Sequence, residues 1–222
     1  MNQSILQEAK KRGHPTLKQY MAWAQLLYWF FREHLTLIFY GQSVRDGRTE
    51  RVLKKLREKD SLRAQWYDGR WVYCVKRINR RRYDRIPNHI YHGLGCSEGL
   101  VRFYLSDRNC TIIPAREFQN LGYRPEWGMT LSTGMTLLYE FCTEDNTKRR
   151  LKQKLQSYAG LPHNQVVLFV LDISKEHLPK YIAGSYFFID YETFKSVSYG
   201  EQLTAPIYIW GGDGTKNPLR KK

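Results

Sequence analysis

The stretch of residues 62–75 reads LRAQWYDGRWVYCV, and it predicts a β-hairpin. Apolar and aromatic residues alternate with polar ones in its two halves, residues 62–67 and 70–75, which is the period of a β-strand. Asp68-Gly69 lies between the halves, and an Asp-Gly pair is a strong signal for a two-residue type I′ turn. The stretch is therefore expected to fold as two antiparallel strands joined at Asp68 and Gly69.

A basic helix is expected directly before this hairpin, over residues 43–59. At about 100° per residue, the apolar residues that can face inward are Val52, Leu53 and Leu56. Three cations fall within about 60° of one another on a separate stripe, namely Arg48, Arg51 and Lys55. The helix is therefore expected to present a cationic stripe away from its packed face.

Further upstream, apolar residues recur with helical spacing over residues 17–32, and a shorter segment, residues 35–40, is expected to end at Gly41. The resulting order is helix, turn, basic helix and two-stranded hairpin. That is the order of a winged helix-turn-helix, whose second helix enters the major groove of DNA and whose wing touches the backbone or the minor groove. We therefore expect a winged helix DNA-binding domain over residues 17–77.

Positive charge is concentrated in the same part of the chain. The 222 residues include 36 Lys or Arg and 21 Asp or Glu, for a formal net charge of +15. Residues 1–85 hold 20 cations and 8 anions, or +12, whereas residues 86–222 hold 16 and 13, or +3. This asymmetry favours contact with a polyanion, and double-stranded DNA is the partner that the winged helix pattern predicts. The alternative is that these cations only keep the surface solvated.

The residues expected to contact DNA lie on the basic helix, the hairpin and the basic linker that follows, and most would contact phosphate. They are Arg45, Arg48, Arg51, Lys55, Arg63, Arg70, Arg80, Arg81 and Arg82. One or two of these arginines would read guanine edges.

The second half of the chain is expected to be an α/β domain with a mixed sheet, because strand-like runs alternate with helical segments. A helix is expected over residues 89–105, and a polar, Lys-rich helix over about residues 144–158. The expected strands are residues 111–113, 135–141, 166–171, 186–189 and 207–210.

Two carboxylates in this half suggest chemistry. Glu126 precedes the strongest predicted strand and Glu140 lies inside it, where a buried carboxylate costs several kcal/mol unless it is paired or binds a metal. Lys154 and Tyr158 are spaced i, i+4 and share one face of the Lys-rich helix. Two carboxylates and a lysine can serve metal-assisted phosphodiester hydrolysis, in which the carboxylates hold Mg²⁺ and the lysine stabilises the developing charge. The alternative is a purely structural Glu140–Lys154 ion pair.

The order of these features resembles the replication-relaxation family of plasmids and other mobile elements, over about residues 17–182. The motifs that carry the resemblance follow the winged helix pattern and are His89-x-x-His92, Arg116-Glu117-Phe118, Pro125-Glu126-Trp127-Gly128, Leu138-Tyr139-Glu140-Phe141-Cys142-Thr143 and Lys154-x-x-x-Tyr158. The resemblance implies a DNA-binding protein needed for plasmid replication or relaxation. It also implies a second domain similar to PD-(D/E)XK nucleases, that is, a restriction-endonuclease-like fold.

The resemblance assigns catalytic roles to Glu126, Glu140, Lys154 and Tyr158. Glu126 and Glu140 would occupy the two acidic positions and hold Mg²⁺. The nuclease pattern has a lysine two positions after the second acidic residue, and this chain has Cys142 there. Lys154 could supply a migrated lysine, and Lys154-x-x-x-Tyr158 looks like the Q-x-x-x-Y motif of some nuclease branches. A scaffold kept only for DNA or protein contact fits the same pattern.

Three functions follow as hypotheses: a replication or relaxation accessory that binds DNA, a metal-dependent DNA nuclease, and a winged helix transcriptional regulator. A homodimer and replication or mobilisation proteins are further candidate partners. The expected divisions are an extension (1–16), the winged helix (17–77), a basic linker (78–87), the restriction-endonuclease-like domain (88–214) and a basic tail (215–222). No apolar run reaches the about 18 residues of a membrane span, no secretion signal is recognisable and no CxxC pair occurs, so we expect a cytoplasmic protein with free thiols.

Overall fold

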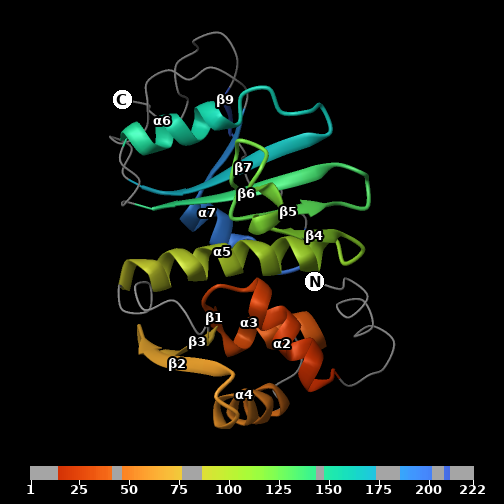
Figure 1. The fold of residues 1–222 in the computed structure, drawn as a ribbon, viewed down its shortest axis with the longest axis vertical. Helices are drawn as coiled ribbons and strands as arrows, with labels where there is room; N and C mark the ends of the chain where they lie inside the picture. The colour runs from red at the N-terminus through yellow and green to blue at the C-terminus, as the bar shows by residue number, and fades with distance from the viewer. Residues whose placement is uncertain are drawn as a thin grey trace. The chain divides into compact units, whose positions relative to one another are not determined.

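The computed structural model describes residues 15–41, 47–76, 87–143, 148–173, 186–201 and 208–210 (Figure 1). The chain divides into two compact units, Met1–Leu105 and Ser106–Lys222. The division falls later than the expected boundary near residue 87, because most of helix α5 (Pro87–Ser106) belongs to the first unit. Most of the predicted extension, most of the predicted linker and the tail lie outside the described residues.

The first unit contains the predicted hairpin. Strands β2 (Leu62–Tyr67) and β3 (Arg70–Val75) pair antiparallel. Asp68 and Gly69 have φ of 47° and 76°, as a type I′ turn requires. A third strand, β1 (Phe30–Phe31), adds to β3, so the sheet order is β1-β3-β2.

The helices before the hairpin differ in one respect from the expectation. Helix α2 (Leu17–Leu26) begins with a capping box between Thr16 and Gln19 and ends at Leu26, so the helix predicted over residues 17–32 is wrong beyond Leu26. The reason is tertiary pairing: Phe30 is fully buried and pairs with Tyr73. Helix α3 (Arg32–Tyr40) follows, and Gly41 ends it with φ of 75°, as predicted.

Helix α4 (Arg48–Glu58) is the basic helix predicted before the hairpin. Leu53 and Leu56 are buried as expected, whereas Val52 is only half-buried. Thr49 is also buried, and its hydroxyl lies 3.1 Å from the Thr36 hydroxyl of α3. These contacts fix which side of α4 faces solvent.

Helix α5 is continuous, although its glycines predicted a weak helix. Gly93 is needed for packing, because a Cβ atom there would lie 2.8 Å from the Trp29 side chain and 3.2 Å from its backbone nitrogen. Trp29 packs with Ile90 and Leu94 of α5 in one apolar cluster. Farther along α5, Glu98 accepts from Arg102 at 2.6 Å and its other oxygen lies 3.0 Å from Nε2 of buried His34.

The second unit is built on a mixed sheet, as predicted. Its described strands lie in the order β4-β5-β6-β7-β8-β9, of which β6, β7 and β8 run parallel and the other pairings are antiparallel. The strands are β4 (Thr111–Pro114), β5 (Trp127–Thr130), β6 (Thr136–Thr143), β7 (Gln165–Asp172), β8 (Tyr186–Asp190) and β9 (Tyr208–Trp210). Strand β5 was not predicted. A 3₁₀ turn, η1 (Ala115–Phe118), follows β4.

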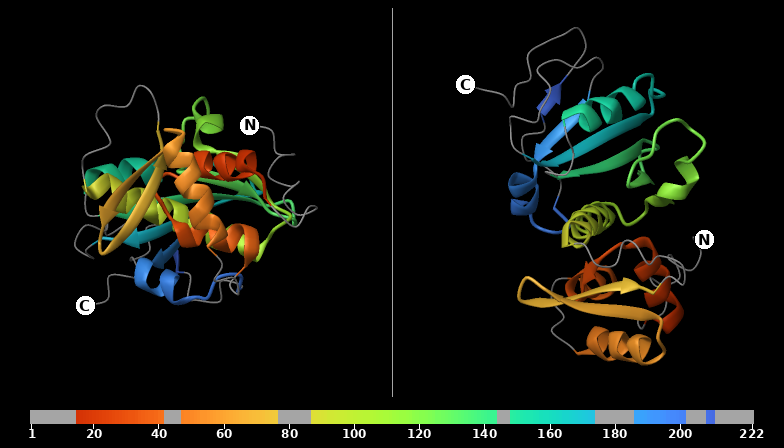
Figure 2. Two further views of the ribbon diagram at one scale, coloured as in Figure 1. Left: turned by 90° about the horizontal axis from the view of Figure 1, so that it is seen from below. Right: turned by 60° about the vertical axis from the view of Figure 1, so that its left-hand side comes forward.

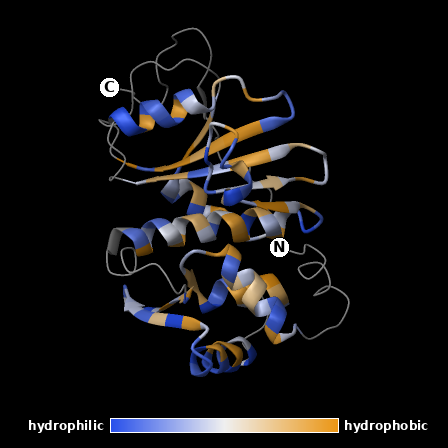
Figure 3. Cartoon of the chain, viewed as in Figure 1, coloured by the Kyte–Doolittle hydropathy of each residue, from blue (hydrophilic) through white to orange (hydrophobic). Residues whose placement is uncertain are grey.

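Two helices pack on this sheet. Helix α6 (Lys148–Ser157) packs Leu151 and Leu155 against Phe169 of β7. Helix α7 (Tyr191–Ser196) packs against the other face, where Phe194 and Tyr191 approach Tyr139 and Phe141 of β6 (Figure 2). Strand β6 is buried along its whole length, and Figure 3 shows β6 and β7 as mainly hydrophobic strands beside a largely hydrophilic α6.

None of the helices among the described residues combines the length and apolar composition of a membrane-spanning segment.

Candidate functional site

The cationic stripe of α4 lies on the surface of the first unit. Arg48, Arg51 and Lys55 are all exposed, while Leu53 and Leu56 on the packed side are 1% exposed. The structure thus brings the three predicted helix cations onto one exposed side of α4. Arg32 of α3 reaches the same helix through an ion pair with Glu50 at 3.3 Å.

The predicted cations of the hairpin, Arg63 and Arg70, are also exposed. The Arg70 guanidinium carbon lies 3.8 Å from the centroid of the Phe31 ring, so the hairpin cation is braced against β1. The remaining candidates, Arg45, Arg80, Arg81 and Arg82, lie outside the described residues.

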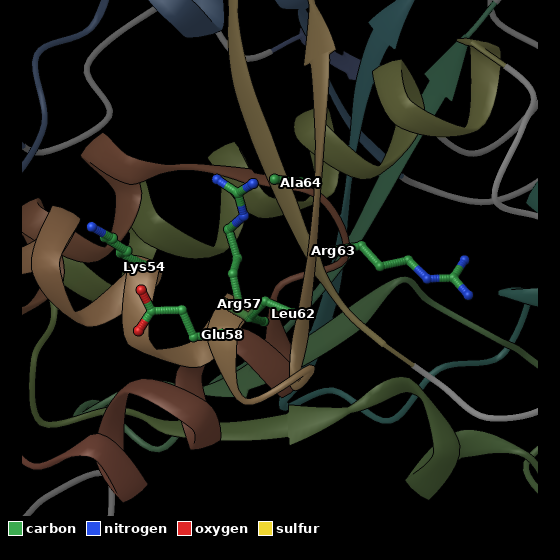
Figure 4. Close-up of a pocket in the computed structure, with 6 residues that line it drawn as sticks. All are labelled: Lys54, Arg57, Glu58, Leu62, Arg63 and Ala64. Atoms are coloured by element: carbon green, nitrogen blue, oxygen red, sulfur yellow. The ribbon is translucent and has the colours of Figure 1, made fainter.

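A hollow of about 640 Å³ is lined by residues of α4 and of strand β2 of the hairpin (Figure 4). It is lined by Lys54, Arg57, Glu58, Leu62, Arg63 and Ala64. In Figure 4 the Arg57 and Lys54 side chains lie on the α4 side, whereas Arg63 points away from them. Lys54 and Arg57 were not among the residues predicted to contact DNA. Their spacing of i, i+3 on the helix that precedes the hairpin indicates that they share one side of that helix.

In the second unit the four residues predicted as catalytic converge. Glu140 lies in the middle of β6 on the face toward α6, between buried Leu138 and Cys142, and it is fully buried. Tyr158 follows α6 directly, and its hydroxyl donates a hydrogen bond to Oε1 of Glu140. Lys154 of α6 forms an ion pair with Oε2 of the same carboxylate. One oxygen of Glu140 therefore accepts a hydrogen bond from Tyr158, and the other faces the Lys154 ammonium.

Glu126 completes this cluster. Its backbone N–H donates to the backbone carbonyl oxygen of Tyr139 at 2.9 Å. This hydrogen bond holds the residue that precedes β5 against β6. Its Oε1 lies 3.6 Å from Nζ of Lys154. The side chains of Glu126 and Lys154 are 20% and 24% exposed, so the cluster is buried at Glu140 and open to solvent at its other end. We call Glu126, Glu140, Lys154 and Tyr158 the carboxylate–lysine cluster.

Burial and neighbouring charges set the protonation of this cluster. Burial raises the pKa of Glu140 to about 7, although the Lys154 ammonium opposes the shift. Burial lowers the pKa of Lys154, but the Glu140 carboxylate outweighs it and holds that pKa above its ordinary value. Burial and the Glu140 carboxylate raise the pKa of Tyr158. Lys154 thus remains a cation and Tyr158 a hydrogen-bond donor at neutral pH.

Cys142 occupies the position at which the nuclease pattern has its lysine. It is fully buried, and burial raises the pKa of its thiol to about 12. It packs with Leu151 and Phe169 in the apolar cluster under α6. Cys142 is therefore a neutral core residue at physiological pH.

The geometry of the cluster does not fit Mg²⁺ between the two carboxylates. Mg²⁺ requires oxygen ligands at about 2.1 Å in near-octahedral geometry. The Nζ atom of Lys154 already lies between the carboxylates of Glu126 and Glu140 and supplies the positive charge there. An ammonium and a divalent cation cannot share that position. The cluster as built is a pair of carboxylates that share one lysine ammonium.

Comparisons with family models, with curated proteins and with solved structures found no match to this chain.

Proposed function

We propose that this chain is a DNA-binding protein whose first unit is a winged helix-turn-helix and whose second unit is a restriction-endonuclease-like domain that does not cleave DNA. The role that we propose is in plasmid-type replication or relaxation, and its support is the resemblance of the sequence motifs to the replication-relaxation family. The proposal rests mainly on one observation, the exposed stripe of Arg48, Arg51 and Lys55 on the helix that precedes the hairpin.

The element order supports the winged helix assignment. Helices α2, α3 and α4 precede the β2–β3 hairpin, and β1 adds a third strand beside β3. In helix-turn-helix proteins the second helix of the motif inserts into the major groove, and α4 is that helix here. Residues 47–76 carry nine Lys or Arg and four Asp or Glu, a net charge of +5 (9 − 4). Such a surface suits contacts to DNA phosphates.

The assignment of the second unit as a scaffold rests on Lys154. Its ammonium contacts both of the carboxylates that would otherwise recruit a metal ion, and the Tyr158 hydroxyl donates to Oε1 of Glu140. A buried ion pair completed by additional hydrogen bonds is a structural element that does not need a metal. The role of the unit is then to hold DNA or a protein partner.

Duplex binding tests the proposal. Fluorescence anisotropy with a labelled duplex of about 20 base pairs, measured between about 50 and 200 mM salt, should give a steep linear fall of log K with log salt. The variant Arg48→Ala/Arg51→Ala/Lys55→Ala should bind about tenfold or more weakly and show a shallower slope. The matched control is Arg149→Ala/Arg150→Ala/Lys152→Ala, which removes the same charge from exposed positions of α6. Equal losses in both variants would overturn the assignment of α4.

The second candidate function is a metal-dependent DNA nuclease, and the convergence of Glu126, Glu140 and Lys154 favours it. It requires Lys154 to withdraw from between the carboxylates. Incubation with supercoiled and linear plasmid in Mg²⁺ or Mn²⁺ separates the candidates. Nicking by the wild-type protein that disappears in Glu140→Ala would establish the nuclease, whereas binding without cleavage is the result that we expect.

A further inference from the structure

The hairpin carries a pair of exposed tryptophans. Trp66 and Trp71 are directly opposite each other in the β2–β3 register, and their side chains are 59% and 45% exposed. Their ring centroids lie 5.4 Å apart at 82°, an edge-to-face pair. The other tryptophans whose side chains the structure describes, Trp23, Trp29 and Trp127, are all buried. The exposed pair is thus a local feature that core packing does not explain.

The surroundings of this pair are cationic. Side chains alternate along a strand, so Leu62, Ala64 and Trp66 lie on one face of β2, which is the face toward the hollow beside α4. The Arg57 guanidinium carbon of α4 lies 5.5 Å from the centroid of the Trp71 ring. Lys54 lines the same hollow. Aromatic faces and cations therefore meet on one exposed side of the hairpin.

We propose that Trp66 and Trp71, with Arg57 and Lys54, form a stacking site for unpaired nucleobases. Proteins that bind single strands combine aromatic platforms for the bases with cations that follow the phosphate backbone. Because Arg57 lies over the Trp71 ring, Trp66 is the ring that receives a base, and Trp71 braces it. In an intact duplex the faces of the bases are already stacked on each other, so the ligand is a single strand or the single-stranded part of a junction.

The stacking site rests on the proposed function in one respect, because α4 would hold a duplex next to the unpaired bases. It deepens that function by adding a second kind of DNA ligand, a single strand. The hollow is then the place for the backbone of the single strand, since Lys54 and Arg57 line it. A protein that holds a duplex and an adjacent single strand is suited to DNA whose strands are being separated.

The experiment compares three fluorescein-labelled probes by anisotropy at fixed salt: a blunt duplex, an oligothymidylate of about 20 nucleotides, and the same duplex with a thymidylate extension. Trp66→Ala should weaken binding of the oligothymidylate and the extended duplex about tenfold, and should change blunt-duplex affinity by less than about twofold. Trp66→Phe should retain most of the affinity because it keeps a ring. Trp66→Leu, which keeps apolar area without a π face, should behave like Trp66→Ala.

Salt dependence and a control variant sharpen the test. Trp66→Ala should leave the slope of log K against log salt unchanged, because it removes no phosphate contact. Tyr28→Leu, which removes another exposed ring outside the hairpin, should leave all three affinities unchanged. Circular dichroism and thermal melting of each variant verify folding.

The two proposals fail in distinguishable ways. If Trp66→Ala and Trp66→Leu bind the oligothymidylate and the extended duplex as tightly as the wild type, the stacking site is overturned and blunt-duplex binding still stands. If the oligothymidylate is bound through Trp66 while the blunt duplex is not bound at all, the stacking site stands and the proposed duplex function is overturned. Equal weakening of all three probes by Trp66→Ala would overturn the assignment of the pair to unpaired bases.

Discussion

The ammonium of Lys154, in α6, forms an ion pair with Oε2 of Glu140, which is fully buried at the centre of β6. The same ammonium lies 3.6 Å from Oε1 of Glu126. One cation therefore contacts two carboxylates that come from different parts of the second unit. Since Tyr158 donates to the remaining oxygen of Glu140, the pair joins α6 to the sheet by specific polar contacts as well as by the packing of Leu151 and Leu155.

Replacement of Lys154 by methionine should destabilise the protein. Removal of one partner of a buried pair leaves an uncompensated charge and costs about 3–5 kcal/mol. We expect the lower end of that range at pH 8, because the Lys154 side chain keeps 24% of its exposure. Urea denaturation followed by circular dichroism measures the free energy of unfolding.

Two further variants test this explanation. Lys152→Met, at an exposed position of the same helix, should change the free energy of unfolding by less than about 0.5 kcal/mol. The double variant Lys154→Met/Glu140→Gln removes both charges and should recover much of the lost stability. A double variant that is less stable than Lys154→Met would show that the charge of Glu140 is not the source of the loss.

The raised pKa of Glu140 predicts a pH dependence of stability. The ordinary pKa of the carboxyl is 4.5, and burial raises it to about 7 in the folded protein despite Lys154. Between these values the folded state keeps a proton that the unfolded state has lost. The contribution of Glu140 to stability should therefore decrease as pH rises from about 4.5 to 7, by at most about 1.4 kcal/mol per pH unit.

Glu140→Gln should flatten that part of the profile, because glutamine does not titrate. The measurement is urea denaturation of the wild type and the variant at several pH values in this window. Glu117→Gln, in an exposed pair with Arg116, is the control and should keep the wild-type slope. Parallel profiles for the wild type and Glu140→Gln would contradict the assigned shift.

The hydroxyl of Tyr158 should stabilise the fold through Glu140. Tyr158→Phe removes the donor to Oε1 but keeps the ring, which lies 5.8 Å from Phe169 by centroid. At pH 8, where Glu140 with its pKa of about 7 is mostly ionised, loss of a hydrogen bond to this charged group costs about 1.5–3 kcal/mol. Tyr123→Phe removes a bond to the neutral side chain of Gln165 at 3.0 Å and should cost less, about 1 kcal/mol or below. Thermal melting would contradict this order if Tyr123→Phe were the less stable variant.

The hairpin and the cluster illustrate what local sequence determines. Asp68-Gly69 requires positive φ at two successive residues, so the turn and the register of β2 and β3 follow from local chemistry. Convergence of Glu140 with Lys154 also had a local basis, because a carboxylate inside an apolar strand needs a partner and the next helix offers a lysine.

Features that depend on long-range packing could not be predicted from the sequence. Helix α2 ends at Leu26 because Phe30 and Phe31 pair with β3, more than 40 residues away in sequence, and helical periodicity carries no information about that pairing. The position of the Lys154 ammonium between two carboxylates depends on how α6 docks on β6 and β7. The exposure of Trp66 and Trp71 depends on how α4 packs along the face of the hairpin on which both tryptophans lie.

The last prediction concerns the position of the Lys154 ammonium. If this cation occupies the place of a metal ion, Lys154→Ala should open a site between the carboxylates of Glu126 and Glu140 for a divalent cation. About 10 mM MgCl₂ or MnCl₂ should then raise the melting temperature of Lys154→Ala, because a ligand that binds only the folded state stabilises it. The wild type should not respond, since its ammonium holds the position. Glu126→Gln/Lys154→Ala should lose the response, because one carboxylate is missing. An equal rise in the melting temperature of the wild type and of Lys154→Ala would show that the ions bind elsewhere. The idea that the Lys154 ammonium occupies the place of a metal ion would then have no support.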